Sequence, residues 1–382
     1  MHESLGSPQM IRSLNERRIL ELIFQQAPLS RAEISRMTGL SKPTVSAAVK
    51  SLLDYGLVEE IGPGEAGPGR KPTLVRFAMT YRYVLGIQLG ADRARLLLTD
   101  LQAQPAAERE LDIRSLTGDP ERLLETIRTE SDLLLAQARV EWEQIGSVSV
   151  AIPGVVSAIG EVSMLVSDLR GCEAALARSA LARRFPAPVV TDNDVNLAAL
   201  AEYDAGQGHP DEVFVFLFLD SGIGAGIMIG GRLVRGLGGG AGELGDMRRP
   251  DGSRLEDLLS EQALLARMLS SQTAAYSLAR LFDQASEGET TAEQAVADYV
   301  AELAGAVHSL ATVIAPERIM LGGRIGEQPL VLQRLEQQLA AQHPLMPQLG
   351  AAALGRESVL TGAVQMAITD TMSHIRSTLL HA

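Results

Sequence analysis

The sequence predicts an α/β protein in which a small helical module precedes a larger, two-lobed domain with a cleft between its lobes. Two observations support this prediction. The first eighty residues place apolar side chains at helical spacing, between residues that cap and end helices. The rest of the chain contains two hairpins with glycine-rich turns, each followed by further strands and helices. We therefore divide the chain into residues 1–80 and 81–382.

The composition fits a globular protein of two or three domains. Hydrophobic residues make up 46% of the 382 residues, yet no apolar run reaches the roughly 18 residues that span a bilayer. The first residues, "MHESLGSPQMIRSLNERR", lack the apolar segment of a signal peptide. A single cysteine, Cys172, excludes an internal disulfide framework. We expect a cytoplasmic protein that does not bind membranes.

The charge is unevenly distributed along the chain. The net charge is −13, but residues 1–76 hold ten Lys and Arg against eight Asp and Glu, whereas the remainder holds 24 against 39. Such asymmetry is a hint of a basic binding module. A simple preference for Arg over Lys outside the first segment is the alternative, and it stays open.

The basic segment has the pattern of a helix-turn-helix. Ser30 can cap a helix over Arg31–Thr38, and Gly39 can end it in a left-handed conformation. Ser41 can cap the next helix, in whose first turn Pro43 loses no hydrogen bond. The recognition helix is then expected at Ser41–Tyr55.

Two short strands, "GLVEEIG" and "TLVRFAM", flank "GPGEAGPGRKP" and complete a winged helix. Basic residues at a Gly/Pro-rich tip suit a narrow minor groove, and the start of the recognition helix faces bases or phosphates. The expected partner is double-stranded operator DNA, and the candidate contacts are Arg17, Arg18, Ser41, Lys42, Thr44, Ser46, Lys50, Arg70 and Lys71. The alternative is a winged helix used for protein contacts.

The larger domain alternates strands with helices. Strands are expected in "YRYVLGIQLGADRARLLLTDL", "IGSVSVAIPGVVS", "VFVFLFLDSGIGAGIMIGGRLVRG" and "RIMLGGRIGE". Helices are expected at about Glu121–Arg139, Leu197–Ala205, Leu255–Leu269, Ala292–Ile314, Leu330–Gln342 and Val359–Leu379.

One stretch, "VVTDNDVNLAALAEY", gathers short polar side chains where a strand meets a helix. Carboxylates and carboxamides in such a place can bind the hydroxyl groups of a sugar. Asp194 could also accept a proton from a hydroxyl that attacks a phosphate. The pattern alone leaves both roles open.

The order of motifs resembles the ROK family (repressors, open reading frames, kinases). After the winged helix come "GIQLGADRARLLLTDL", "AIPGVVS", "DNDVNLAALAE", "GIGAGIMIGGRLVRG", "GAGELGDM" and "MLGG". The resemblance implies an actin-like sugar-kinase fold, with lobe 1 at about 81–193 plus a C-terminal helix at 357–382, and lobe 2 at about 194–356. It implies ligand contacts from Asn193, Asp194, Glu243, Asp246 and Glu256, and in kinase members a catalytic base at Asp194.

The chain departs from the kinase members at both phosphate turns. Gln88 replaces an Asp that helps to hold magnesium, and Asp92 lies where a hydroxyl should bind phosphate. Two like unit charges about 4 Å apart repel by about 4 kcal/mol at an effective dielectric constant of about 20. The second turn begins with Asp220 and Ser221. We expect no ATP binding, no catalytic residue and no cofactor.

Metal binding is also not expected. Family members commonly carry a cysteine-rich zinc loop after "GELGH", whereas here Asp246 takes the histidine position and "MRRPDGSRLEDLL" contains no cysteine. Arg248 and Arg249 could meet a sugar phosphate, or they could be a solvated part of this loop.

These features favour a transcriptional regulator, a repressor of carbohydrate-related genes, that binds DNA as a homodimer or tetramer and responds to a sugar-like effector. The alternatives are an active ATP-dependent sugar kinase fused to a DNA-binding domain, and a regulator that no longer responds to any ligand.

Overall fold

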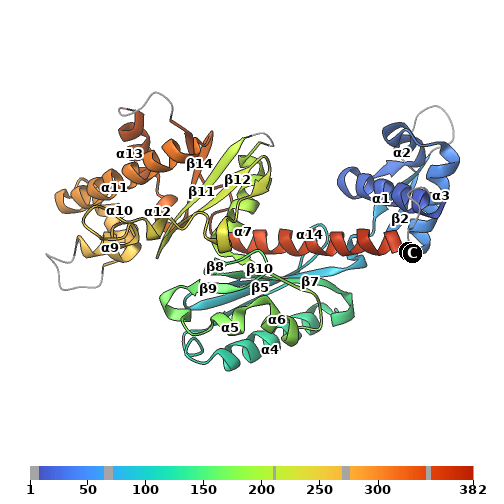
Figure 1. Cartoon of the computed structure of the whole chain (residues 1–382), viewed down its shortest axis with the longest axis horizontal. Coiled ribbons are helices and arrows are strands. Elements are labelled where there is room, and N and C mark those ends of the chain that lie inside the picture. The colour runs from blue at the N-terminus through green and yellow to red at the C-terminus, as the bar shows by residue number, and fades with distance from the viewer. Residues whose placement is uncertain (1–7, 64–71, 210–211, 269–275, 341–345, 382) are drawn as a thin grey trace.

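The N-terminal module is a winged helix. The computed structural model describes residues 8–63, 72–209, 212–268, 276–340 and 346–381. The module consists of α1 (Pro8–Gln26), β1 (Leu29–Ser30), α2 (Arg31–Thr38), α3 (Lys42–Asp54), β2 (Val58–Pro63) and β3 (Thr73–Phe77). Strand β3 lies between β1 and β2 and runs antiparallel to both. In Figure 1 the module lies at one end of the molecule, beside the C-terminal end of α14 (Ser358–His381).

The helix ends of this module are the ones predicted. Ser30 Oγ accepts a hydrogen bond from Glu33 N at 3.2 Å, and the Glu33 carboxylate accepts one from Ser30 N at 2.8 Å. Gly39 ends α2 with φ of 69°. Ser41 Oγ accepts from Thr44 N at 3.3 Å and so caps α3. These local capping bonds confirm the predicted helix-turn-helix.

Two five-stranded sheets with the same topology form the lobes. The first contains β4 (Tyr83–Leu89), β5 (Arg93–Asp100), β6 (Pro105–Asp112), β7 (Ile145–Ile152) and β10 (Val189–Asn193). The second contains β11 (Val213–Leu219), β12 (Ile223–Ile229), β13 (Arg232–Leu233), β14 (Arg318–Gly322) and β15 (Gln348–Ala351). The strand orders are β10-β7-β4-β5-β6 and β13-β12-β11-β14-β15. In each sheet three antiparallel strands are extended by two parallel ones, which confirms the two-lobed fold.

Helices cover both faces of each sheet. On the first sheet, α4 (Pro120–Ala138), α5 (Glu173–Leu176) and α6 (Arg178–Arg184) share an apolar core with the strands, beside the hairpin of β8 (Gly154–Val156) and β9 (Val162–Leu165). On the second lie α8 (Glu256–Leu259), α9 (Glu261–Ala266), α10 (Leu278–Ser286), α11 (Thr290–Ile314), α12 (Gly323–Gly326) and α13 (Pro329–Ala340). Helices α7 (Asp194–Glu202) and α14 (Ser358–His381) lie between the sheets (Figure 1). In the ranges that the structure describes, no helix is long and apolar enough to cross a membrane.

Helix α14 packs very closely on its neighbours. A Cβ at Gly362 would lie 1.9 Å from the carbonyl oxygen of Leu197 in α7. A Cβ at Gly86 in β4 would lie 2.8 Å from Cγ2 of Val364. Because neither glycine has a side chain, α14 contacts α7 and the first sheet directly.

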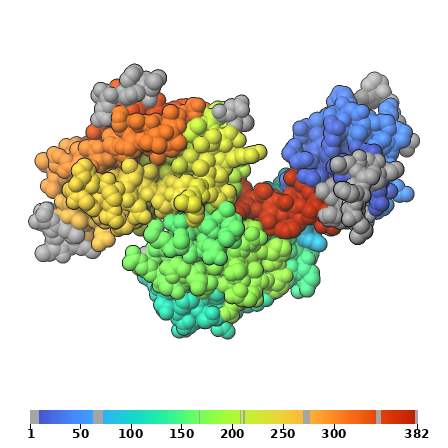
Figure 2. Space-filling view, in the orientation of Figure 1, coloured from blue at the N-terminus to red at the C-terminus, as the bar shows by residue number. Residues whose placement is uncertain are grey.

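The C-terminal half of α14 packs against the winged helix. Met372 and Leu379 share an apolar cluster with Ile19 and Leu20 of α1. Arg376 Nη2 lies 3.6 Å from Glu21 Oε1 across the same contact. Figure 2 shows α14 filling the space between the winged helix and the lobes. One helix therefore contacts both lobes and the N-terminal module.

The structure corrects several predicted elements. The helix predicted at Leu255–Leu269 is two short helices, because Ser260 is extended (φ −71°, ψ 157°) and caps the second through Ala263 N. The helix predicted from Leu197 begins at Asp194. The sequence pattern did not predict β6 or α10. The domain and lobe boundaries drawn from the sequence stay a proposal.

Candidate functional site

The exposed face of α3 carries the central DNA-contact candidates. Lys42, Ser46 and Lys50 are exposed and four residues apart, so they form one stripe along the helix. Neither lysine forms an ion pair with the part of the chain that the structure describes. Ser41 and Thr44 lie at the start of the stripe, where their hydroxyl oxygens are 2.8 Å apart.

The other basic residues of the module differ in their surroundings. Arg18 on α1 is exposed and Arg17 is half-buried. Other arginines are neutralised, at Arg12–Glu16 (3.0 Å), Arg31–Glu60 (2.7 Å) and Arg76–Glu59 (2.6 Å). Arg70 and Lys71 of the wing lie outside the described residues. The stripe on α3 is therefore an uncompensated positive surface among these groups.

The predicted ligand site begins where β10 (Val189–Asn193) meets α7 (Asp194–Glu202). Asn193 Oδ1 accepts from Asn196 N at 2.8 Å and so caps α7, while its Nδ2 donates to the carbonyl of Gly154 at 2.9 Å. Each side-chain atom of Asn193 keeps one further hydrogen-bonding position. The Asn193 amide therefore fixes the end of β10 relative to α7 and Gly154. One acceptor position on Oδ1 and one donor position on Nδ2 remain for a ligand.

The preceding residue, Asp192, forms an ion pair with Arg235 that the sequence analysis did not predict. Its side chain is 1% exposed, and Oδ2 accepts from Nε and Nη2 of Arg235 at 2.9 and 2.6 Å. Its Oδ1 accepts from the backbone N of Asn193 at 2.8 Å. This buried, saturated ion pair ties the segment after β13 to the end of β10.

Asp194 is the first residue of α7. Its Oδ1 accepts from Val195 N at 2.9 Å, a bond that favours the ionised carboxylate. Burial has the larger effect, and together with the nearby charge of Glu243 it raises the pKa of Asp194 to about 7. At neutral pH this side chain can both donate and accept a proton.

Glu243, Asp246 and Glu256 lie together next to Asp194. Burial, then the charges of Asp246 and Glu256, raise the pKa of Glu243. Arg254 Nη1 lies 3.4 Å from Asp246 Oδ1 and 3.1 Å from Glu256 Oε2. Four of the five predicted ligand residues thus form one acidic group, in which a single arginine joins the outer two.

The second phosphate turn is closed by an ion pair. Arg324 donates from its backbone N to Asp220 at 3.0 Å and from Nη2 at 2.5 Å, and Nη2 also lies 2.5 Å from Glu261. Burial alone would raise the pKa of Asp220, but the hydrogen bonds from Arg324 outweigh it and lower the pKa. A phosphate at this turn would lie beside the Asp220 carboxylate, and Arg324 already forms ion pairs with Asp220 and Glu261.

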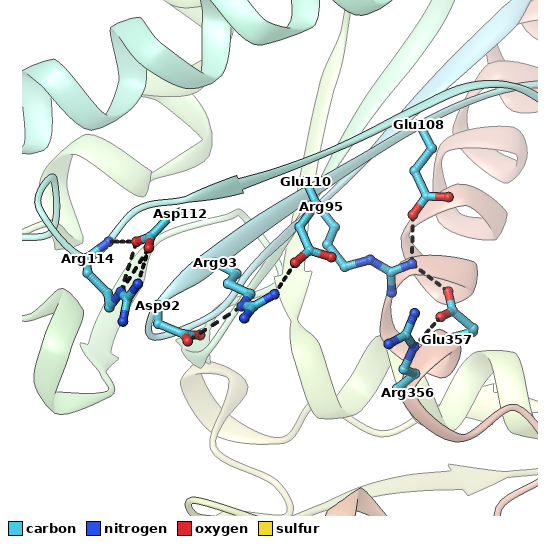
Figure 3. A network of polar contacts seen from close by, with 9 residues as sticks. All are labelled: Asp92, Arg93, Arg95, Glu108, Glu110, Asp112, Arg114, Arg356 and Glu357. Carbon is cyan, nitrogen blue, oxygen red and sulfur yellow. Dashed lines mark hydrogen bonds and ion pairs between the residues drawn. The ribbon is translucent and has the colours of Figure 1, made fainter.

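The first phosphate turn also differs from a magnesium-phosphate site. Gln88 Oε1 is buried at the end of β4 without a hydrogen-bond partner among the described residues. Asp92 is exposed, and Arg93 Nε lies 3.7 Å from it, which reduces the repulsion expected from the sequence. Figure 3 shows this pair between the Asp112–Arg114 pair and the further carboxylates and arginines of β5 and β6. These residues extend to Glu357, which Arg95 contacts at 2.8 Å, just before α14.

The loop after "GELG" offers neither a free basic pair nor a metal site. Arg249 forms an ion pair with Glu302 of α11, and Arg248 Nη1 donates to the carbonyl of Gly252 at 3.3 Å. Over the described stretches of chain, no three His, Cys, Asp or Glu side chains are arranged to hold a metal ion. The loop is held by its own hydrogen bonds and by the ion pair of Arg249 with α11.

Sequence reasoning missed three arginines: Arg235, Arg254 and Arg324. Each lies in or beside a quoted motif, since Arg235 lies within "GRLVRG", Arg324 follows "MLGG", and Arg254 precedes Glu256 by two residues. An arginine next to an acidic ligand motif was the available signal. The pairings themselves could not be foreseen, because Asp192 and Asp220 bind partners 43 and 104 residues away.

The fold and the site define a class of protein: a two-lobed domain of the sugar-kinase type, with a winged helix at its N-terminus. The chain belongs to the ROK family, whose pattern matches residues 84–370. Residues 12–59 match a winged helix-turn-helix DNA-binding family.

Two curated relatives cover most of the chain. The xylose repressor of Caldicellulosiruptor bescii is 26% identical over 97% of this chain and 99% of its own length. The DNA-binding transcriptional dual regulator NagC of Escherichia coli is 25% identical over 86% of this chain and 84% of its own length.

Solved structures share the fold. A ROK family transcriptional regulator, a homolog of the E. coli MLC protein, matches 98% of this chain and 100% of its own with a TM-score of 0.74 at 22% identity. A ROK family glucokinase from Streptomyces griseus, in complex with glucose and AMPPNP, matches 74% of this chain and 98% of its own with a TM-score of 0.61 at 21% identity. The longer match includes the winged helix as well as the lobes.

Proposed function

We propose that the protein is a transcriptional repressor of carbohydrate-related genes whose DNA affinity is set by a sugar or sugar derivative. It binds double-stranded operator DNA through α3 and the wing. The effector binds in the cleft at Asn193, Asp194, Glu243, Asp246 and Glu256. The observation that carries the proposal is the unpaired lysine stripe of α3 on the same chain as a ROK cleft. The names of the curated relatives, xylose repressor and transcriptional regulator NagC, support it.

The protein is a regulator and not an enzyme. Asp194 has a pKa suited to a general base, but a base acts on a phosphoryl donor only if the donor is held in line with it. The Asp220–Arg324 pair closes the turn that would hold the donor. Without a donor, Asp194 is a group that holds the ligand.

The functional unit is a homodimer or tetramer. Helix-turn-helix proteins read two half-sites about one helical turn of DNA apart, so two copies of α3 must be presented together. The junction between α14 and the winged helix fixes how each copy of α3 is oriented relative to its own lobes.

The test is a titration of promoter fragments, including the one upstream of the protein's own gene, with full-length protein at low salt. Fluorescence anisotropy should show saturable binding to at least one fragment, and one member of a sugar panel should change the affinity. If no fragment binds, the DNA-binding proposal is wrong. A coupled ADP-release assay should show no turnover with any sugar. Turnover that Asp194→Asn abolishes would establish the kinase instead.

A further inference from the structure

One buried carboxylate joins three segments of the chain. Asp192 Oδ1 accepts from Asn193 N at 2.8 Å and from Asn196 Nδ2 at 3.2 Å. Its Oδ2 accepts from Arg235 Nε and Nη2 at 2.9 and 2.6 Å. Asp192 and Asn193 end β10, Asn196 lies in the first turn of α7, and Arg235 follows β13. The bonds to Arg235 are therefore the ones that reach a segment of the second sheet.

The Asp192–Arg235 pair connects the outer strands of the two sheets. β10 is an edge strand of the first sheet, and β13 is an edge strand of the second. The Asp192 side chain is 1% exposed, whereas that of Arg235 is 35% exposed. Separating the pair would leave the buried carboxylate without its countercharge, which is strongly unfavourable. The pair therefore resists a movement of one edge away from the other.

Arg235 also begins a loop that is fixed to the second sheet. We call residues 235–242 the bridging loop. Ala241 N donates to the carbonyl of Arg235 at 3.0 Å and so closes the loop. Ala225 N of β12 donates to the carbonyl of Gly242 at 2.8 Å, which anchors the end of the loop.

The bridging loop makes a second contact with the first lobe. At Gly239 φ is 89°, and a Cβ there would lie 2.0 Å from the carbonyl oxygen of Val156 in β8. The loop therefore rests on the first lobe at Val156 and at Asp192. The contact at Val156 is one of close packing, whereas the contact at Asp192 is charged and directional.

The proposed effector contacts lie on either side of this bridge. Asn193 and Asp194 follow Asp192 directly in the chain, and Glu243 follows the last residue of the bridging loop. A change in the position of Arg235 relative to Asp192 would therefore change the spacing between the two groups of contacts.

We propose that Arg235 is a positioning residue, and that its ion pair with Asp192 holds the two lobes in the arrangement that binds the effector. The proposal rests on the proposed function, because it takes the residues on either side of the pair as effector contacts. Arg235 acts through Asp192 rather than by touching the sugar. If loss of the pair reduces the binding-competent arrangement to about a tenth of the molecules, the apparent Kd for the sugar rises about tenfold.

Three variants change the pair in different ways. Asp192→Asn keeps the size of the side chain and the Oδ1 acceptor, but its amide nitrogen cannot accept from Arg235. Arg235→Met keeps much of the side-chain volume and removes every donor, at a cost in stability because Asp192 stays buried. Arg235→Lys keeps the charge without the two-donor geometry and should lie between wild type and Arg235→Met.

Arg109→Met is the matched control. The Arg109 side chain is 34% exposed and its Nε lies 2.6 Å from Glu130 Oε2, close to the 35% and 2.6 Å of the Arg235 pair. Arg109 lies in β6 and Glu130 in α4, so this pair joins two elements of the same lobe.

Spin labels measure the lobe arrangement without any sugar. The exposed substitutions Arg122→Cys in α4 and Glu336→Cys in α13 place one label on each lobe, while Cys172 is buried. Double electron–electron resonance should give a broader distribution of label-to-label distances when the ion pair is removed than in wild type or the control. An unchanged distribution would overturn the proposal.

Calorimetry measures the consequence for binding. The probe is whichever of D-glucose, D-mannose, D-xylose and N-acetyl-D-glucosamine binds the wild-type full-length protein most tightly. Asp192→Asn and Arg235→Met should each raise its Kd at least about tenfold, and Arg109→Met should leave it unchanged. A purely structural role would lower the melting temperature and the number of active sites per chain but not raise the Kd of the sites that remain.

The outcomes separate this proposal from the proposed function. If wild type binds a sugar and Asp192→Asn binds it as tightly, the positioning role is wrong and the sugar-responsive regulator stands. If wild type binds operator DNA but no sugar of the panel, the effector site is wrong and the positioning role falls with it. Asp192→Asn leaves no carboxylate without a countercharge, so it decides the question even if Arg235→Met does not fold.

Discussion

At the scale of single residues, Asp194 combines two opposed influences. It stands at the N-terminus of α7 and accepts a backbone hydrogen bond from Val195, and both features favour the charged form. Burial and the charge of Glu243 outweigh them and raise the pKa to about 7. An ionised Asp194 is therefore costly in the folded protein, and a ligand can relieve that cost.

The raised pKa predicts how stability depends on pH. The folded protein keeps a proton on Asp194 up to about pH 7, whereas an unfolded Asp releases it near pH 3.9. The folded state therefore binds more protons between these values, and the free energy of unfolding falls as pH rises, by at most about 1.4 kcal/mol per unit. Above about pH 7 the contribution is constant.

Asp194→Asn should remove this dependence. The variant has no proton to lose, so its stability relative to wild type should increase from pH 4 to pH 8. Urea denaturation at several pH values measures the difference in unfolding free energy. Glu336→Gln, which makes a carboxyl-to-amide change at an exposed position of α13, is the matched control. A difference for Asp194→Asn that is the same at every pH would contradict the raised pKa.

The lysine stripe gives a second prediction at this scale. Lys42→Ala and Lys50→Ala should each weaken DNA binding and, if the lysine contacts a phosphate, lower the slope of log K against log salt by about one. Arg122→Ala removes the same charge from the exposed side of α4 and should do neither. If all three variants bind as wild type does, α3 is not the DNA-binding face.

Residue types at the site were predictable, but their partners were not. The motif around Asp194 shows which carboxylates stand near a strand end, because that information lies within a few residues. The raised pKa of Asp194 depends first on burial by the fold and then on Glu243, which is 49 positions further along the chain. The ion pair of Glu256 depends on the fold of one loop around Arg254. Such distances are set by tertiary packing rather than by spacing.

At the scale of elements, the best predictions are those that depend on local chemistry. Ser30, Gly39 and Ser41 determine helix ends through bonds to residues at most four positions away. The break between α8 and α9 follows from Ser260, which caps α9. From the sequence alone, a serine at this position could either cap a new helix or lie inside one longer helix. β6, with the sequence "PAAERELD", is an edge strand with mostly exposed charged residues and lacks a buried apolar pattern.

The close contact of α7 with α14 gives a prediction for an element. Gly362→Ala would place a Cβ 1.9 Å from the carbonyl oxygen of Leu197, a backbone atom that cannot move alone. We expect a loss of about 2–4 kcal/mol in the free energy of unfolding. Gly305→Ala in α11 meets nothing within 4 Å and should instead stabilise the protein by up to about 1 kcal/mol. Denaturant unfolding of both variants measures this, and equal effects would refute the tight contact.

At the scale of the whole molecule, α7 and α14 connect the cleft to the DNA-binding module. Asp194 begins α7, and three residues later Leu197 contacts Gly362 of α14. At the other end of α7, the buried Glu202 accepts from the backbone N of Ala353 and Leu354 at 2.8 and 2.9 Å, just before α14. The far end of α14 shares its apolar core with α1. A rotation of α7 would therefore move α14, against which the winged helix packs.

This arrangement predicts a reciprocal coupling between ligand and operator. We propose that a ligand bound by both Asp194 and Glu243 favours one relative position of α7 and the segment that carries Glu243, and that α14 transmits that position to the winged helix. If the ligand weakens operator binding tenfold, operator must weaken ligand binding about tenfold, because the two affinities share one free-energy cycle. Titrations of ligand with and without operator measure one side of the cycle, and titrations of operator with and without ligand measure the other.

Glu243→Gln tests whether the cleft is the source of this coupling. Glu243 belongs to the proposed ligand site and lies outside the apolar core that the described part of the winged helix shares with α14, so the variant should bind operator with nearly the wild-type affinity in the absence of ligand. Its operator affinity should no longer change at ligand concentrations that saturate wild type. Glu336→Gln, which is remote from both sites, should respond normally. A Glu243→Gln variant that responds fully would show that the effector acts elsewhere, and the path through α7 and α14 would then have no input at the cleft.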